Sequence, residues 1–248
     1  MSTAPAVPSA EPPSETARII DTFVAPTKTF ADLKRVSRWW SPFLLIVIAS
    51  YALIGVAGQK IGWEQLTENG LRLQPKQAAQ LEKLPADQRA AAMERAVKIT
   101  RGISYAFPAI NLILLLIITA VLMASFNFGA GAEIPFGTAL GVVMYASLPG
   151  ILKAVLAIAS LMAGANPESF NFQNPVATNP GYFIDPVASP ALFRLASAVD
   201  VIMIWTLVLA AIGFAAVSKL KRGTTFAVVF GWYIVFILAA TALGALFA

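Results

Sequence analysis

The sequence contains neither cysteine nor histidine, and charged residues make up only 12% of its 248 positions, whereas 58% are hydrophobic. Average soluble domains carry about 25% charged residues. Structural zinc, iron–sulfur and haem sites depend on Cys or His ligands, and Ser–His or Cys–His nucleophilic systems need an imidazole. No Gly-rich phosphate loop or carboxylate cluster suited to a metal appears either. We therefore expect no enzyme, no metal ion and no cofactor.

The hydrophobic residues gather in five blocks that are long enough to cross a bilayer. A hydrocarbon core of about 30 Å needs roughly 20 mostly apolar residues in a helix, which satisfies its own backbone hydrogen bonds. A chain of this size is too small to bury five such helices inside a polar shell. The sequence therefore predicts an all-α, polytopic integral membrane protein with five transmembrane helices, at about residues 41–58, 103–127, 136–163, 195–217 and 226–248.

Two different segments precede the first block. Residues 1–17 are rich in Pro, Ala and Ser and are predicted to form a disordered cytoplasmic tail. Residues 18–40 alternate apolar and basic positions at helical spacing and end in two tryptophans, a pattern typical of a helix lying in the headgroup plane. The alternative is a helix packed against another cytoplasmic loop. The candidate membrane-interface residues are Phe30, Lys34, Arg35, Arg38, Trp39 and Trp40.

Two long connections separate the first four blocks. Residues 59–102 contain two helix candidates that begin at Pro75 and Pro85, where the first helical position tolerates the missing N–H. This segment is predicted to be a helical insertion outside the membrane. Residues 165–194 are punctuated by Asn-Pro and Asp-Pro pairs, which form turns. Their aromatic residues favour an ordered loop close to the membrane surface.

The Lys and Arg residues indicate an orientation. Residues 1–40 contain five of them and the short connection 218–223 contains three. Cytoplasmic segments are enriched in these residues, so both are predicted to lie in the cytoplasm, with the C-terminus outside. Residues 59–102 hold eight Lys or Arg against five Asp or Glu, but long translocated segments obey the rule less well. We interpret the net charge of +5 as a topology signal rather than a nucleic-acid-binding surface.

Lys153 and Asp200 are the two ionisable residues within the predicted spans, and such residues are candidates for function because their burial is costly. Spans three and four run antiparallel, so the two side chains could meet as a pair that lines a polar path. Alternatively, the lysine extends toward the headgroups and the aspartate caps its helix near the interface. The scarcity of other polar residues along the spans favours the second interpretation.

Several short sequences together resemble the YIP domain family, whose name refers to interaction with Ypt/Rab GTPases. They are Pro26–Phe30 before the basic stretch, Trp39–Pro42, Tyr145–Pro149, Gly181–Pro186, and Asp200–Gly213 followed by Ser218 and Lys219. The similarity covers about residues 18–248 and is closest to bacterial members, which have an enlarged first outer loop. The resemblance implies five membrane helices, a cytoplasmic N-terminus and a bacterial cytoplasmic (inner) membrane location. For eukaryotic relatives it implies vesicle traffic and Rab recruitment, and it defines no catalytic residues.

These observations favour a non-catalytic integral membrane protein that organises membrane or protein partners. Its expected partners are anionic lipid headgroups at the N-terminal segment and other membrane subunits in a homo- or hetero-oligomer, without nucleic acid. The alternative is a small permease or channel that uses Lys153 and Asp200.

Overall fold

The computed structural model describes residues 14–247, and every regular element in that range is a helix. Five helical stretches are long and apolar enough to span a membrane: Trp40–Lys60, Ala86–Gly129, Phe136–Met162, Val201–Ser218 and Arg222–Gly244. The prediction of an all-α protein with five spans is therefore confirmed. The elements are α1 (Glu15–Val24), α2 (Pro26–Asp32), α3 (Trp40–Lys60), α4 (Trp63–Arg72), α5 (Pro75–Glu82), α6 (Ala86–Ala124), η1 (Ser125–Gly129), α7 (Phe136–Ala146), α8 (Pro149–Met162), η2 (Pro167–Ser169), η3 (Pro180–Phe183), α9 (Pro190–Ala198), α10 (Val201–Ser218) and α11 (Arg222–Phe247).

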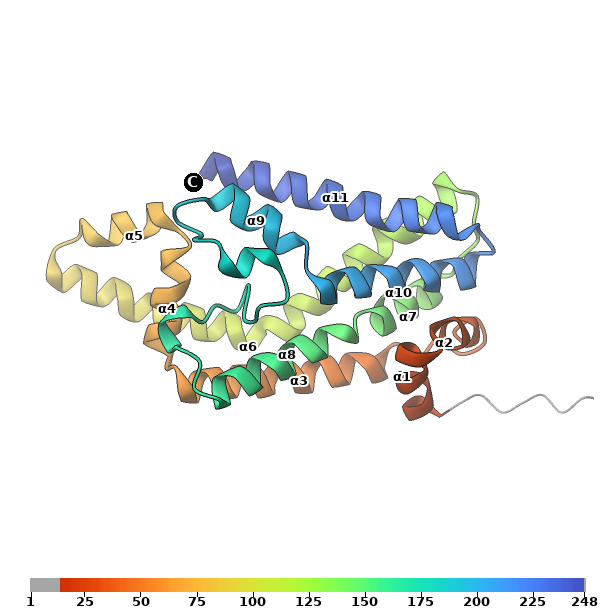
Figure 1. The fold of residues 1–248 in the computed structure, drawn as a ribbon, viewed down its shortest axis with the longest axis horizontal. Helices are drawn as coiled ribbons and strands as arrows, with labels where there is room; N and C mark the ends of the chain where they lie inside the picture. The colour runs from red at the N-terminus through yellow and green to blue at the C-terminus, as the bar shows by residue number, and fades with distance from the viewer. Residues whose placement is uncertain (1–13, 248) are drawn as a thin grey trace, which may run out of the picture.

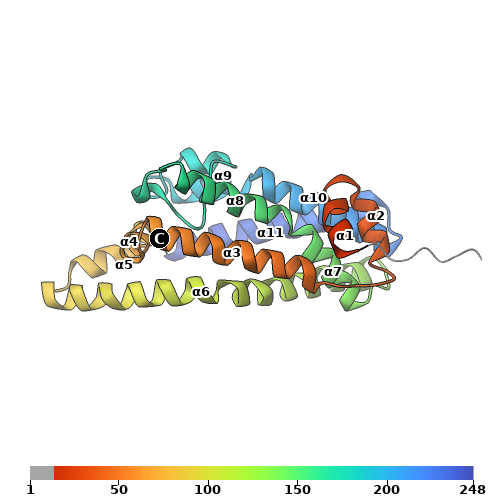
Figure 2. The same ribbon diagram turned by 90° about the horizontal axis from the view of Figure 1, so that it is seen from below.

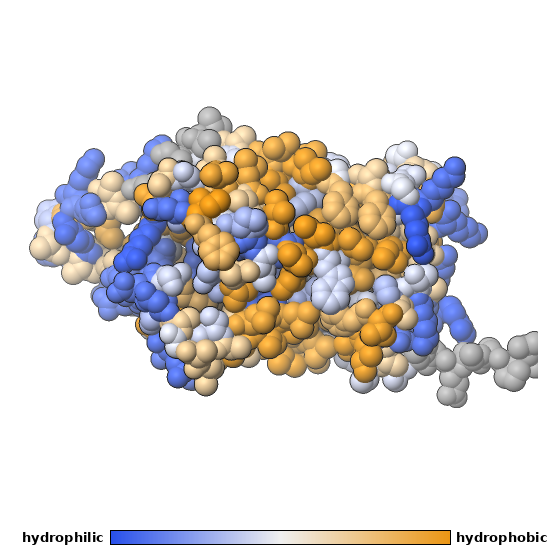
Figure 3. Space-filling model, in the orientation of Figure 1, coloured by the Kyte–Doolittle hydropathy of each residue, from blue (hydrophilic) through white to orange (hydrophobic). Residues whose placement is uncertain are grey.

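The spans run along the long axis of an elongated bundle (Figure 1), and the two ends of the bundle differ. One end, here called the N-terminal end, carries α1, α2 and the α10–α11 connection. The other, the insertion end, carries α4, α5 and the first turns of α6, which extend beyond the remaining helices (Figure 2). Hydrophilic surface gathers at both ends, and a hydrophobic band separates them (Figure 3). This distribution fits a bilayer around the middle of the bundle.

The N-terminal helices pack into the bundle. Ser14 caps α1 by accepting a hydrogen bond from the Ala17 N–H, and α2 follows after Pro26. Phe30 and Leu33 expose none of their surface and belong to the main core with residues of α6, α7 and α10. Helix α1 begins at Glu15, inside the segment expected to be a disordered tail. The rest of that expected tail, residues 1–13, lies outside the described residues.

The third span is broken in the middle. Helix α7 ends at Ala146 and α8 begins at Pro149, so Ser147 and Leu148 form a short connection between two helical halves. A proline has no N–H to donate to the preceding turn and is favoured at the first position of a helix. Pro149 therefore begins a new helix within the third span.

The fourth span differs from the single helix expected over residues 195–217. Helix α9 ends at Ala198, and α10 begins only at Val201. Asp200 between them has an extended backbone and caps α10 with its carboxylate. The apolar run had concealed this break, because a hydropathy pattern does not distinguish one continuous helix from two consecutive ones.

The insertion is more helical than expected. The candidates at Pro75 and Pro85 correspond to α5 and the start of α6, and α4 forms an additional helix after Gly62. Gly62 has φ 88°, a left-handed conformation that glycine adopts without steric cost. The indole of Trp63 then packs on Tyr105 of α6, with ring centroids 5.7 Å apart. The guanidinium of Arg101 lies 5.9 Å from the same indole centroid.

Candidate functional site

Asp200 is the centre of a polar cluster inside the bundle, where its side chain is only 4% exposed. Its Oδ1 accepts hydrogen bonds from the backbone N–H groups of Ile202 (2.9 Å) and Met203 (3.0 Å). Its Oδ2 accepts from Lys153 Nζ at 2.8 Å, Thr178 Oγ1 at 2.6 Å and Asn179 Nδ2 at 3.1 Å. We call Lys153, Asn174, Thr178, Asn179 and Asp200 the Asp200 cluster.

The Asp200 cluster binds the loop after α8 into the break of the fourth span. Asn174 and Asn179 exchange side-chain hydrogen bonds of 2.7 and 3.1 Å. The Asn179 amide oxygen also accepts a hydrogen bond from the Tyr182 N–H and so caps the start of η3. The Thr178 carbonyl accepts from the Val201 N–H at 3.1 Å. The loop therefore satisfies backbone groups that the break in the helix would otherwise leave unpaired within the bilayer.

Asp200 lies at the start of the fourth span, and Lys153 lies in the second half of the third. Helix α10 has 18 residues and so separates Asp200 from the N-terminal end by about 27 Å. Lys153 lies nine residues before Met162 at the end of α8, about 14 Å from the opposite end of its span. The Tyr233 hydroxyl, near the middle of α11, donates to the Ala198 carbonyl beside the break. The Lys153–Asp200 pair therefore lies between the two polar ends of the bundle.

The structure brings Lys153 and Asp200 together, although the sequence favoured separate roles for them. The Asp200 carboxylate also caps α10. Sequence reasoning missed Thr178 and Asn179. The Asn179-Pro180 pair was read only as a turn signal, and nothing local indicates that this turn enters the bundle.

A second polar cluster, the Glu15 cluster, fixes the N-terminal helices. The Arg18 side chain is 1% exposed and forms ion pairs with Glu15, at 3.2 Å, and with Asp32. The same guanidinium donates to the Val36 carbonyl at 3.3 Å. A buried arginine is tolerated only when it is paired and hydrogen-bonded. Arg18 therefore fixes α1, α2 and the following connection relative to one another.

Glu15 connects these helices to two membrane spans. Its Oε2 accepts hydrogen bonds from Ser41 Oγ of α3, at 2.5 Å, and from Tyr145 OH of α7, at 2.8 Å. Burial raises the pKa of the Glu15 carboxyl, but the hydrogen bonds from Ser41 and Tyr145 and the nearby guanidinium groups of Arg18 and Arg38 lower it by more. The net pKa is lower than usual, so the charged form is favoured in the fold.

The predicted membrane-interface residues separate into two groups. Phe30 lies in the protein core against α10 and α7 and not at the surface. Lys34, Arg35, Arg38 and Trp40 are exposed, whereas Trp39 is half-buried and contacts Phe43. The structure therefore packs Phe30 against the bundle, leaves Ile20 and Trp40 exposed, and places the cations of the segment at the N-terminal end.

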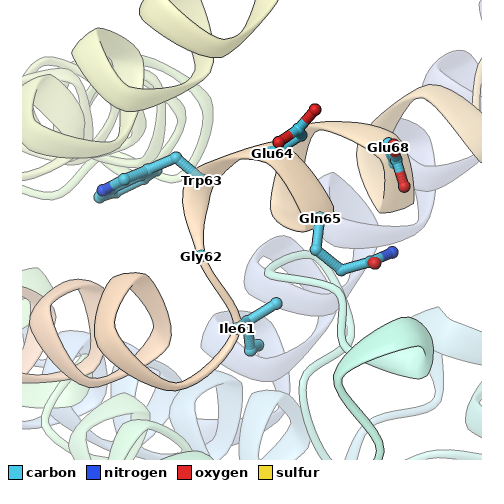
Figure 4. Close-up of a pocket in the computed structure, with 6 residues that line it drawn as sticks. All are labelled: Ile61, Gly62, Trp63, Glu64, Gln65 and Glu68. Carbon is cyan, nitrogen blue, oxygen red and sulfur yellow. The ribbon is translucent and has the colours of Figure 1, made fainter.

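A shallow depression at the insertion end lies where α3 turns into α4 (Figure 4). Its carboxylates, Glu64 and Glu68, lie one turn apart on α4, and Trp63 points away from them toward α6. Two carboxylates are too few for a metal site, and residues 14–247 contain no group of three or more His, Cys, Asp or Glu side chains that could hold one ion. We assign no chemistry to this depression.

The bundle and its two internal polar clusters define an integral membrane protein with five spans and two broken helices. The Yip1 domain family model matches residues 20–243, so the chain belongs to the Yip1 domain family, as its sequence resemblance had suggested. This is a family of non-enzymatic membrane proteins. Comparison with curated proteins and with solved structures gives no match.

Proposed function

We propose that this protein is a non-catalytic membrane scaffold that organises lipids or protein partners at the N-terminal end of its bundle. We further propose that it resides in the inner membrane of a bacterium, with this end in the cytoplasm. The observation that carries the proposal is a set of exposed cations at that end, which come from the α2–α3 connection, the α10–α11 connection and the first residue of α11: Lys34, Arg35, Lys219, Lys221 and Arg222.

These cations are held on a fixed support. The α2–α3 connection that carries Lys34 and Arg35 begins at the fully buried Leu33, and its Val36 carbonyl accepts from Arg18. Lys219 follows α10, which packs directly against α2. A cationic surface gains free energy near anionic lipids, by about 1 kcal/mol per Lys or Arg. A fixed cluster on a membrane-anchored protein is suited to bind an anionic membrane or an acidic protein surface.

A vesicle-capture experiment tests the proposal. Proteoliposomes made with neutral lipid are mixed with fluorescent vesicles that contain either phosphatidylglycerol or only phosphatidylcholine, and capture is measured by co-flotation. We expect capture of the anionic vesicles alone, which weakens as salt is raised. The double variant Lys34→Gln/Arg35→Gln is expected to reduce it.

The matched control is Lys76→Gln/Lys83→Gln, which removes two exposed cations at the insertion end. It is expected to retain capture. If both double variants lose vesicle capture equally, the capture depends on net charge and not on the N-terminal end. Undiminished capture by the Lys34→Gln/Arg35→Gln variant would contradict the proposal. Deletion of residues 1–40 is a poorer test, because it also removes Phe30 and Arg18 from the interior of the protein.

The alternative, a small permease or channel, has the Lys153–Asp200 contact as its supporting observation. Five hydrogen bonds already occupy the Asp200 carboxylate, which leaves little capacity for a transported cation. Solute flux into proteoliposomes that falls in Lys153→Ala and Asp200→Ala would support this function over the scaffold.

A further inference from the structure

Within residues 14–247, the Lys153 ammonium group uses only part of its hydrogen-bonding capacity. An ammonium group carries three donors, and Lys153 directs one of them to Asp200 at 2.8 Å. Its side chain is 26% exposed. The neighbouring side chains Leu152 and Leu156 of α8 are 40% and 48% exposed. The ammonium group therefore lies beside surface that faces the acyl chains.

In the Asp200 cluster the carboxylate has little further capacity to accept hydrogen bonds, whereas Lys153 still has N–H groups to donate. The two Asp200 oxygens accept five hydrogen bonds, about the number of lone-pair sites that a carboxylate offers. Thr178 and Asn179 direct their donors to the same carboxylate. The unused N–H groups of Lys153 are therefore the place where a ligand would add to the cluster, and that ligand must accept hydrogen bonds.

The cluster is close to the protein surface. Helices α8 and α10 and the loop between α8 and α9 lie on the face drawn in Figure 3, where hydrophilic surface appears within the hydrophobic band. A charged group at this depth is costly, and local thinning of the bilayer with entry of water and headgroups reduces that cost. A phosphate oxyanion would satisfy the ammonium group with charge-assisted hydrogen bonds.

We propose that Lys153 binds a phosphate oxyanion at this position, supplied either by a phospholipid headgroup that enters the polar region or by free phosphate. This site is separate from the cationic surface at the N-terminal end. It is about 27 Å away along α10, and its binding does not depend on Lys34 or Arg35.

Native mass spectrometry of the purified full chain tests the proposal with three probes. The probes are phosphatidylglycerol, a glycosyl-diacylglycerol with the same acyl chains but no phosphate, and inorganic phosphate. We expect Lys153→Met to lose about one bound phosphatidylglycerol, with an affinity drop on the order of tenfold, whereas Lys153→Arg retains it. Glycolipid binding is expected to be equal in all three proteins. A Lys153-dependent adduct with inorganic phosphate would identify the free ion as the source.

Lys76→Met is the matched control, since it removes an exposed lysine at the insertion end and is expected to leave this bound lipid in place. Equal phosphatidylglycerol binding by the native chain and Lys153→Met, or an equal loss of glycolipid, would overturn the proposal. A second measurement does not depend on the folding of Lys153→Met. In the Lys34→Gln/Arg35→Gln variant, phosphatidylglycerol must raise the melting temperature more than the glycolipid does, and equal shifts would also overturn the proposal.

Discussion

The ammonium group of Lys153 lies 2.8 Å from the Asp200 carboxylate, although 47 residues separate the two in the chain. Lys153 belongs to the second half of the broken third span, and Asp200 occupies the break in the fourth. The ion pair therefore joins the second half of the third span to the segment that precedes α10. It also orients the loop that carries Thr178 and Asn179.

The two partners should differ in their effect on stability. Asp200→Ala leaves Lys153 without its counter-ion, uncaps α10 and releases Thr178 and Asn179, so we expect a loss of about 3–5 kcal/mol. Lys153→Met removes one of the five donors to the Asp200 carboxylate, so its loss of stability should be smaller. Thermal unfolding in detergent, followed by circular dichroism, measures both. An equal or larger loss for Lys153→Met would show that the hydrogen bonds at Asp200 are not the stabilising feature.

Gly213 permits the close contact between α10, α7 and α2. A Cβ atom at this position would lie 2.5 Å from Val142 Cγ1 and 3.0 Å from Phe30 Cδ1. Gly213→Ala should therefore destabilise the protein by about 1–3 kcal/mol through overpacking. Gly231→Ala on α11, where nothing lies within 4 Å, is the control. It should be neutral or stabilising by up to about 1 kcal/mol, because Ala is the better helix former. Similar melting temperatures for the two variants would contradict this packing.

Phe30 distinguishes a helix packed in the bundle from one resting on lipid. Phe30→Ala should cost about 3–5 kcal/mol and release α2, since the side chain is fully buried. Trypsin should then cleave more quickly after Lys28 and Lys34, as followed by gel electrophoresis. Ile20→Ala, at a side chain that is 56% exposed, should leave the cleavage rate unchanged. Equal cleavage rates in Phe30→Ala and the native chain would indicate that α2 does not need the Phe30 side chain to stay packed on the core.

Acidification should loosen the N-terminal helices through Glu15. The pKa of Glu15 is lower in the folded protein than its usual value of 4.5. Folding stability from this group is therefore present above about pH 4.5 and is lost as the pH falls through the lowered pKa. Glu15→Gln should be less stable than the native chain at pH 7, and the difference should shrink in acid. Melting temperatures between pH 3 and pH 7 measure this, and a constant difference would contradict the assignment.

The sequence predicted the number of spans well because a continuous apolar run reports directly on the cost of placing a helix in lipid. The break at Pro149 has an equally local cause, since proline removes a hydrogen bond wherever it occurs. The break at Asp200 was missed because the residues that stabilise it, Thr178 and Asn179, come from a loop some 20 residues earlier. Hydropathy carries no information about such long-range partners.

The N-terminal segment is a second case in which the sequence does not reveal the long-range partners. Its amphipathic pattern predicts an apolar face but does not identify what covers that face, and lipid and protein satisfy Phe30 equally well. Arg18 appeared to be one more surface cation of a basic tail, and only the fold reveals that Asp32 and Glu15 surround it. The order of apolar and charged residues along the chain was thus enough to predict a membrane protein. Both polar clusters, in contrast, are formed by tertiary contacts that this order does not reveal.

The packing of α2 on α10 also has a consequence for the order of assembly during synthesis. Phe30 leaves the ribosome long before its partner Gly213, so α1 and α2 have no completed binding surface while four spans are still being made. During that interval their apolar face and adjacent cations suit the membrane surface. We expect the segment to rest there first and to enter the bundle once α10 has been inserted. The two interpretations of residues 18–40 would then describe successive stages of one molecule's biogenesis.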